Sequence, residues 1–254
     1  MNGKPIGRKN YGSIPHLPGS RIGPGDHHCH EGQDRIACLK IRDKHDEVLV
    51  QEKVDGANVG IARIGDQLVP LSRAGYRADT SPYAQHHAFA AWVMSDCSRF
   101  LSVLQDGERL VGEWMMVAHG TRYSLPHEPF VAFDLMRGEE RTPYDEFLTR
   151  IESGHFTTPT LLHRGGSLSI DDAMTALGTN GHHGALDPAE GCVWRVERNE
   201  KVSPHSPERR RRVDFLVKYV RPDKVDGCYL DMPKPLENVW PGKAEVKEAL
   251  TWAS

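Results

Sequence analysis

The 254-residue sequence lacks several features that would assign its class at once. No apolar run approaches the ~18 residues of a membrane-spanning helix, and the polar start MNGKPIGRKNYGS has no signal-peptide core. The five cysteines form no C-x-x-C pair, which favours reduced thiols over a disulfide framework. The formal net charge is −3, so the chain has no global positive field for nucleic acid. We therefore expect a soluble, cytoplasmic protein without membrane contacts, in which any binding of polyanions is local.

The chain changes character at about residue 35. Residues 1–34 are rich in Gly, Pro, His and Arg, which is typical of an extended arm held by turns. Strand-like runs follow at 36–41, 47–53, 58–64, 67–73, 109–117, 130–136, 192–198 and 213–220. Helical patterns interrupt them at 83–104, 142–153, 167–178 and 243–254. Because strands and helices do not alternate regularly, the pattern predicts an α+β fold built on antiparallel sheets.

The run EVLVQEKVDGAN, residues 47–58, places a lysine at the end of an apolar strand. Side chains alternate along a strand, so Lys53 and Asp55 are expected on one face and Glu52 on the other. Gly56 lets the backbone bend and approach a ligand closely. Lys53 could be a nucleophile, because burial and neighbouring cations lower the pKa of a lysine amine. On spacing alone, an ordinary surface ion pair of Lys53 and Asp55 beside a turn is favoured over a nucleophile, because lysines with a shifted pKa are the minority.

The segment EKVDGAN resembles the K-x-D-G-x-N motif of the covalent nucleotidyltransferases, the superfamily of ATP-dependent ligases and capping enzymes. Further segments follow in that superfamily's order, namely LSRAGY (71–76), GEWM (112–115), FVAFDLM (130–136), EGCVWRV (190–196) and FLVKYVR (215–221). The sequence is most similar to the RNA ligase family that includes the phage RNA ligase 2 type. In small relatives an arm like PHLPGSRIGPGD also precedes the lysine strand, so the likeness covers most of residues 11–225.

This resemblance implies a fold and a division of the chain. The expected fold is a nucleotidyltransferase (adenylation) domain of antiparallel sheets with flanking helices. Residues 1–34 would be an extended N-terminal arm, 35–225 the adenylation domain and 226–254 a short C-terminal cap with a helix. The stretch after Lys218 is too short for the OB-fold domain of DNA ligases and capping enzymes. We therefore expect no OB-fold domain.

The resemblance also implies which residues bind and react with the nucleotide. Lys53 would attack the α-phosphate of ATP to form a lysyl-AMP phosphoramidate, with Asp55 as a second catalytic residue of the motif. Glu52 would contact adenine. Asn58 and Arg73 would contact the ribose and phosphate or the polynucleotide end, since a guanidinium suits phosphate oxygens.

Two further nucleotide contacts are implied on strand-like runs. Glu113 would bind the ribose hydroxyls, and carboxylates inside apolar strands are seldom buried without a partner. Phe133 would stack on the base. Without the surrounding motifs, a core position is favoured over base stacking for Phe133.

The resemblance assigns the charges around the phosphates to two more residues. Glu190 would help to hold a divalent metal, Mg²⁺ (or Mn²⁺), because phosphoryl transfer needs its developing charge neutralised. Lys218 would contact the α-phosphate. Many relatives carry two lysines in a K-x-K pattern, whereas this sequence has Lys218 alone, and Arg221 is the candidate for the second cation.

Other polar segments permit two explanations each. The run DHHCH, residues 26–30, offers zinc ligands, but neighbours on an extended chain point different ways and a polar loop explains it as well. Arg21, between turn residues, is a candidate contact to nucleic acid or a nucleotide phosphate. The run Arg209, Arg210, Arg211 and Arg212 either binds a polyanion or is simply solvated.

Together these motifs predict an ATP-dependent RNA ligase that seals 5′-phosphate to 3′-hydroxyl ends. Its partners would be ATP and RNA, as a nicked duplex, a single strand or an RNA/DNA hybrid. One alternative is a nucleotidyltransferase of the capping or DNA-ligase type, which GTP dependence would indicate. Another is a non-catalytic module that binds nucleic-acid ends, which the incomplete lysine pair permits.

Overall fold

The computed structural model describes residues 3–203, 205–230 and 232–243. The chain divides into two units, each built from separate stretches of sequence. Unit 1 comprises Met1–Gly12, Asp55–Thr158 and Gly227–Ser254, and unit 2 comprises Ser13–Val54 and Pro159–Asp226. Within the described residues, no helix has the length and apolar character to cross a membrane. The segments expected at 1–34, 35–225 and 226–254 remain a prediction.

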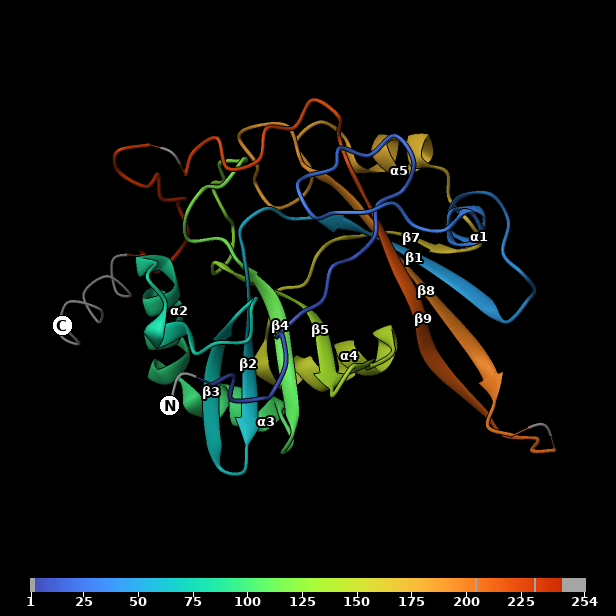
Figure 1. The fold of residues 1–254 in the computed structure, drawn as a ribbon, viewed down its shortest axis with the longest axis horizontal. Helices are drawn as coiled ribbons and strands as arrows, with labels where there is room; N and C mark the ends of the chain where they lie inside the picture. The colour runs from blue at the N-terminus through green and yellow to red at the C-terminus, as the bar shows by residue number, and fades with distance from the viewer. Residues whose placement is uncertain (1–2, 204, 231, 244–254) are drawn as a thin grey trace. The chain divides into compact units, whose positions relative to one another are not determined.

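Unit 1 contains a five-stranded antiparallel sheet in the order β3-β2-β4-β5-β6 (Figure 1). Its strands are β2 (Ala57–Ile64), β3 (Gln67–Ser72), β4 (Glu108–Trp114), β5 (Phe130–Arg137) and β6 (Glu140–Arg141). Its helical segments are η2 (Ala78–Thr80), α2 (Ala84–Ser95), α3 (Cys97–Val103), α4 (Tyr144–Ile151) and η3 (Glu152–Gly154). An aromatic cluster packs α2 against the sheet, with ring centroids 5.2 Å apart for Trp92 and Trp114 and 5.5 Å apart for Trp92 and Phe130.

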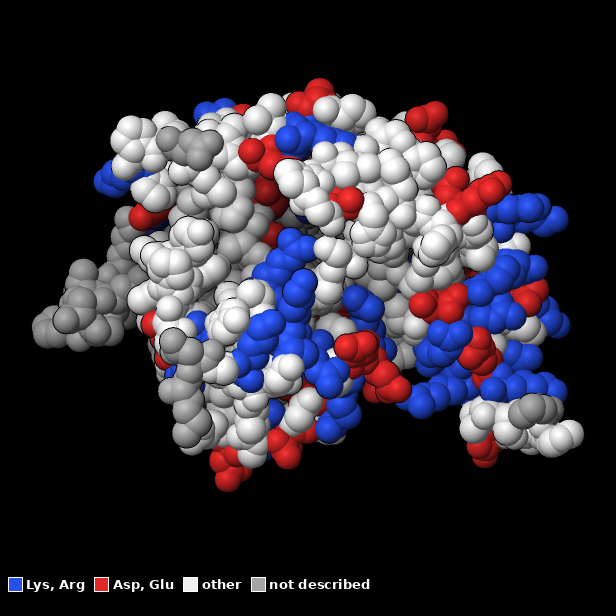
Figure 2. All heavy atoms as spheres, viewed as in Figure 1, with Lys and Arg blue, Asp and Glu red and all other residues white. Residues whose placement is uncertain are grey.

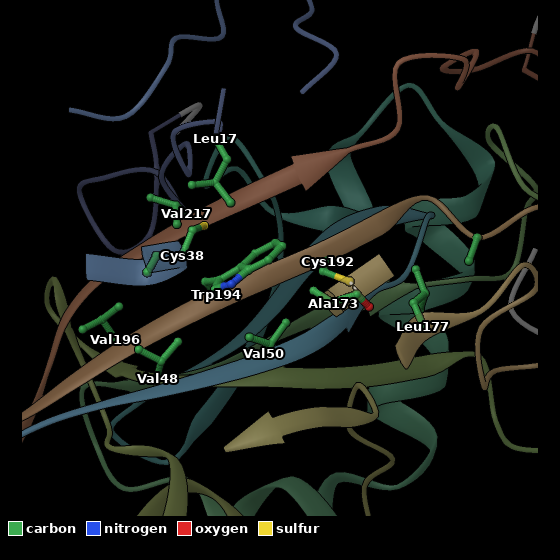
Figure 3. Packing of buried hydrophobic residues seen from close by; sticks show 12 residues of the cluster. Leu17, Cys38, Val48, Val50, Ala173, Leu177, Cys192, Trp194, Val196 and Val217 are labelled. Carbon is green, nitrogen blue, oxygen red and sulfur yellow. Dashed lines mark hydrogen bonds between the residues drawn. The ribbon is translucent and has the colours of Figure 1, made fainter. Parts of the chain in front are cut away.

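Unit 2 contains a four-stranded antiparallel sheet in the order β7-β1-β8-β9 (Figure 1). Its strands are β1 (Asp46–Lys53), β7 (Leu161–Gly165), β8 (Gly191–Lys201) and β9 (Arg209–Val220). Its helical segments are α1 (Glu31–Asp34), η1 (Arg35–Leu39) and α5 (Ile170–Leu177). The Ser169 side chain caps α5 by accepting from the Asp172 N–H, as its sequence SLSIDDA indicates. Figure 3 shows Trp194 amid the core of this unit, with Val50, Cys192 and Val217 around it.

Most of the predicted elements are present. The runs at 47–53, 58–64, 67–73, 109–117, 130–136, 192–198 and 213–220 correspond to strands β1, β2, β3, β4, β5, β8 and β9. All strand pairs between them are antiparallel, so the predicted antiparallel sheets are confirmed. The helix predicted at 83–104 is two helices, because the backbone leaves the helical region at Asp96 (φ −139°, ψ 60°). The helix predicted at 243–254 lies outside the described residues beyond 243.

One predicted strand is wrong. Residues 36–41 do not form a strand; η1 covers Arg35–Leu39, closed by a hydrogen bond from the Lys40 N–H to the Arg35 carbonyl. The turn buries the adjacent Ala37 and Cys38 in the core of unit 2 and leaves Leu39 exposed. Adjacent buried residues also occur in β1, so the hydrogen bond that closes η1, and not the burial pattern, distinguishes this turn from a strand.

Candidate active site

Lys53, the last residue of β1, lies beside Glu190 in unit 2. In the register of β1 and β8, Lys53 is opposite Gly191, and Glu190 directly precedes that strand. The Lys53 Nζ donates to the Glu190 Oε2 over 2.6 Å. Both side chains are largely covered, with exposed fractions of 22% and 7%. Ion pairs with this geometry and burial have little competition from water.

The segment carrying Glu190 is held against β9 by backbone contacts. A Cβ at Gly191 would lie 1.9 Å from the Tyr219 carbonyl oxygen, so only glycine permits this close approach. The Arg221 N–H donates to the Glu190 carbonyl oxygen, and the Arg221 Nε donates to the Ala189 carbonyl over 2.7 Å. Arg221, the candidate second cation, therefore braces the stretch that precedes β8.

Glu52 is buried in unit 2 and is held by one of its two carboxylate oxygens. Its Oε2 accepts from the His182 N–H over 2.8 Å. Its Oε1 is buried and has no hydrogen-bond partner within the described part of the chain. Gly181 (φ +62°) makes room for this oxygen, since a Cβ there would lie 2.1 Å from it. Burial raises the pKa of Glu52, and the His182 N–H offsets only part of that rise.

Lys218 lies on β9, opposite Val193 of β8. Its Nζ is 3.8 Å from the Asp26 Oδ1, in the run DHHCH. Among the described residues, no group of three or more His, Cys, Asp or Glu side chains is arranged to hold a metal ion. The DHHCH run therefore contributes an acid beside Lys218, and its geometry does not support a zinc site.

In unit 1, Asn58 and Glu113 face each other on adjacent strands. They are register partners in the pairing of β2 with β4. The Glu113 Oε1 accepts from the Gly56 N–H over 3.2 Å, which ties it to the end of the KVDG segment. The Asn58 Oδ1 is buried without a hydrogen-bond partner among the residues that the structure describes. The two side chains therefore lie on one face of the sheet, and the Asn58 Oδ1 is a buried acceptor that a ligand donor could satisfy.

Phe133 lies at a β-bulge. The register of β4 and β5 passes from Val111 opposite Asp134 to Gly112 opposite Ala132, which leaves Phe133 as the extra residue. Bulges re-aim side chains, and here both Phe133 and Asp134 contact Tyr11, whose ring meets the Phe133 ring edge-on at 5.2 Å. Phe133 is only partly buried, so it differs from the fully buried core residues around it.

The remaining motif residues of unit 1 lie in turns. The Asp55 Oδ2 accepts from the Gly120 N–H over 2.9 Å, and the Asp55 N–H donates to the Tyr123 hydroxyl. The strand ends at Lys53, so the alternation assumed for Lys53 and Asp55 does not extend to Asp55. Arg73 follows β3 and is exposed, and its carbonyl accepts from the Asn10 N–H.

Within the residues that the structure describes, four of the five candidate phosphate-binding arginines of unit 2 contact protein groups, namely Arg21, Arg209, Arg211 and Arg212. Arg21 pairs with Asp226 over 2.5 Å. Arg211 pairs with Glu47, and the Arg212 Nε donates to the Glu200 Oε2 over 2.7 Å. Over the surface formed by β8 and β9, basic and acidic side chains are interspersed (Figure 2). This interspersion favours a role in stabilising the hairpin for at least part of the run.

The region that matches a known protein family contains the strands that carry the motif residues. The sequence profile of the RNA ligase family matches residues 46–220, from the first residue of β1 to the last of β9. The chain belongs to the RNA ligase family. A search of curated protein sequences found no match.

Solved RNA ligases are among the structures to which this family member is similar. A Naegleria gruberi RNA ligase with PPi has 17% identity and a TM-score of 0.48, covering 70% of this chain and 50% of that one. An archaeal ATP-dependent RNA ligase has 20% identity and a TM-score of 0.47, covering 83% and 48%. A Naegleria gruberi RNA ligase mutant with ATP and Mn has 13% identity and a TM-score of 0.44, covering 95% and 63%. The chain thus spans about half the length of the first two.

The structure groups the motif residues in two sets, each within its own unit. Unit 2 brings together Glu52, Lys53, Glu190 and Lys218 on three adjacent strands or their ends. Unit 1 groups Asn58, Glu113 and Phe133 on β2, β4 and β5. Among the residues that hold these sets, His182 and Tyr11 carry no motif in the sequence, and Asp26 stood out only as part of the DHHCH run. Their contacts arise from backbone groups and loops, which leave no periodic signal.

Proposed function

We propose that this chain is an ATP-dependent RNA ligase that works through a lysyl-AMP intermediate on Lys53. The observation that carries the proposal is the pairing of the Lys53 Nζ with the Glu190 Oε2 inside the matched family region. The finer description of the fold, a nucleotidyltransferase domain, is part of the same proposal. The antiparallel sheets and the placement of the motif residues at strand ends support it.

The first step would form a nitrogen–phosphorus bond between the Lys53 Nζ and the α-phosphorus of ATP. The bond from that phosphorus to the pyrophosphate oxygen breaks. The Lys53 ammonium loses one proton to become a nucleophilic amine and a second as the new bond forms; Glu190 Oε2 at 2.6 Å is an acceptor for one, and solvent or the released pyrophosphate takes the other. Lys218 would stabilise charge on the α-phosphate oxygens. Glu52 would accept from the adenine amine through Oε1, the oxygen that has no partner among the described residues.

The later steps would transfer AMP and join the ends. A 5′-phosphate oxygen of RNA attacks the AMP phosphorus, the bond to Lys53 breaks, and a 5′-5′ pyrophosphate forms. A 3′-hydroxyl then attacks the 5′-phosphate, loses its proton and releases AMP. The products are a phosphodiester bond and a free Lys53.

The donor set of unit 2 fits a magnesium or manganese ion. Glu190 provides one buried carboxylate, and such ions are commonly held by one or two carboxylates together with substrate phosphates and water. Glu190 would hold the ion, which when bound neutralises charge on the phosphates. Among the described residues, no three Asp, Glu, His or Cys side chains are grouped to hold a metal ion. Most ligands of the ion would therefore come from the substrate and from water.

Intact-mass measurement tests the proposal. The protein is incubated with Mg²⁺ and either ATP or GTP, and we expect an adduct of one AMP with ATP only. Lys53→Ala should abolish the adduct, while Lys40→Ala, at an exposed lysine of the same unit, should keep it. The adduct-bearing protein should then seal RNA with 5′-phosphate and 3′-hydroxyl ends. Absence of an adduct with every nucleotide would contradict the proposal, and a GMP adduct would indicate a capping-type enzyme.

A further inference from the structure

Two short stretches of the N-terminal region extend the sheet of unit 2 beside Lys218. The Lys218 N–H donates to the Pro15 carbonyl over 3.0 Å, and the Leu17 N–H donates to the Lys218 carbonyl over 2.8 Å. His16 thereby forms a parallel β-bridge with Lys218, and on its other side it forms a second parallel bridge with His28. Leu17 is fully buried and lies beside Val217 (Figure 3). The stretch is therefore fixed to β9 by hydrogen bonds and by packing.

His16 and Asp26 form a chain of polar contacts that ends at the Lys218 amine. His16 is almost fully buried, with 2% of its surface exposed. Its Nδ1 lies 2.7 Å from the Ser20 Oγ. Its Nε2 lies 3.2 Å from the Asp26 Oδ2, a close polar contact without hydrogen-bond geometry, and the Gly23 N–H donates to the same oxygen over 3.2 Å. The other oxygen of Asp26, Oδ1, lies 3.8 Å from the Lys218 Nζ. The Ser20 Oγ in turn accepts from the Val220 N–H, so the contacts begin and end on β9.

The charges of this cluster are set by its surroundings. Burial and then the charge of Lys218 lower the pKa of His16, and Asp26 offsets only part of this effect. Burial acts to raise the pKa of Asp26, but Lys218, the Gly23 N–H and His16 together hold it below its ordinary value. At neutral pH Asp26 is therefore an anion between a neutral imidazole and an ammonium group.

We propose that His16 and Asp26 are positioning residues for Lys218: the buried imidazole holds the Asp26 carboxylate, which holds the Lys218 ammonium group toward the reacting phosphate. The inference rests on the proposed function, in which Lys218 contacts the α-phosphate. It gives a role to Asp26 of the DHHCH run and to His16 of the segment before it. A carboxylate held in this way restricts a flexible lysine side chain, and such preorganisation speeds a reaction without adding contacts to the substrate.

Asp26→Asn tests the inference, because it removes the charge and preserves the shape. The first readout is competitive labelling of Lys218 with acetic anhydride, followed by mass spectrometry. Loss of the anion should raise the fraction of neutral Lys218 amine, and with it the labelling, by several-fold. The second readout is the rate of lysyl-AMP formation as a function of ATP concentration. We expect a maximal rate roughly tenfold lower, with the half-saturating ATP concentration changed less than about twofold.

Two control variants make the result specific. Asp26→Glu keeps the carboxylate and should restore part of the rate, whereas a purely structural role for Asp26 predicts no such rescue. Glu31→Gln removes a charge from an exposed acid of the same region and should match the wild type in both readouts. Melting temperatures of all variants establish that they are folded.

The outcomes separate this inference from the proposed function. If the wild-type protein forms no lysyl-AMP, the proposed function fails and the positioning role fails with it. If the wild type forms lysyl-AMP and Asp26→Asn forms it at the same rate, the positioning role alone is wrong. Unchanged labelling of Lys218 in Asp26→Asn would also overturn it, whatever the rate of adenylation.

Discussion

The Glu52 carboxylate is fixed through one oxygen, while its other oxygen is buried without a hydrogen-bond donor among the described residues. The His182 N–H holds one carboxylate oxygen, and the glycine at 181 leaves room for the other. A buried acceptor without a partner costs free energy, about 1–3 kcal/mol when a comparable group loses its hydrogen bond. Such a cost is recovered when a ligand donates to that atom, which is what an exocyclic amine of adenine would do.

Glu52→Gln should therefore change the response to nucleotide. The oxygen of the Gln amide can still accept from the His182 N–H. The NH₂ group of the amide then occupies the place of Oε1 and faces the adenine amine. Two hydrogen-bond donors would therefore face each other. We expect lysyl-AMP formation from ATP to slow roughly 10- to 100-fold, because an unmatched buried polar group discriminates strongly. Glu47→Gln, on the same strand but paired with Arg164 and Arg211, is the matched control. Equal rates for Glu52→Gln and wild type would show that Glu52 does not contact the base.

At the residue scale, the sequence motifs were sufficient to select Lys53, Glu190 and Lys218, which do lie on neighbouring strands of one sheet or at their ends. The residues that hold them could not be selected in the same way. His16 and Asp26 reach Lys218 through turns and parallel bridges, and contacts between residues about 200 apart follow from the tertiary fold. Their roles, like those of the motif residues, await the experiments described above.

At the scale of elements, the start of β1 is tied to β8 by a compact charge cluster. Arg198 donates to Asp43 and Asp46, and Arg42 also donates to Asp46. Hydrogen bonds from Arg198 and then the His45 N–H lower the pKa of Asp43 to about 2. Burial acts to raise the pKa of Asp46, but the hydrogen bonds from Arg42 and Arg198 outweigh it and hold the pKa below its ordinary value.

This cluster predicts a defined acid sensitivity. Both carboxylates have lower pKa values in the folded protein than in the unfolded chain, so their stabilisation is fully present above about pH 4. It is lost as the pH falls from about 4 toward 2. We expect the urea midpoint to fall between pH 4 and pH 2, and to fall less in the Asp43→Asn/Asp46→Asn double variant. An identical acid dependence in both proteins would exclude this cluster as a source of acid lability.

Elements with strong period-2 patterns were predictable, and those without them were not. Strands β1, β2 and β8 alternate or run apolar over several residues, and each was found at its expected place. β7 was not predicted, because its sequence LLHRG is short, partly exposed and pairs along only one of its edges. The error at 36–41 has a similar cause, since a short apolar run does not distinguish a strand from a helical turn.

At the scale of the whole molecule, the charge distribution limits how nucleic acid can bind. The formal net charge is −3, and the described arginines of the 209–212 run include members paired with acids of the same sheet. Binding of an RNA end should therefore depend on a few local cations. We therefore expect weak electrostatic steering of RNA and a modest dependence of its affinity on salt.

Fluorescence anisotropy with a single-stranded 5′-phosphorylated RNA, from 50 to 200 mM NaCl, checks this prediction. If fewer than about six phosphates are neutralised, the slope of log affinity against log salt should be shallower than about −4, since each contributes about −0.7 in single strands. The Arg212→Gln variant should leave the slope unchanged, because Arg212 is engaged with Glu200. A slope near −7 would show that a more extended basic surface takes part.

The separation of Lys53 and Glu190 by 137 positions has a consequence for how the protein is made. Ribosomes add about 5–20 residues per second, so β1 emerges well before either of its neighbours, β7 and β8, exists. During that interval the strand that ends in Lys53 has two unpaired edges, a state that favours association with other chains. Lys53 can meet Glu190 only after the segment before β8 has been synthesised. The pair is therefore completed late in synthesis.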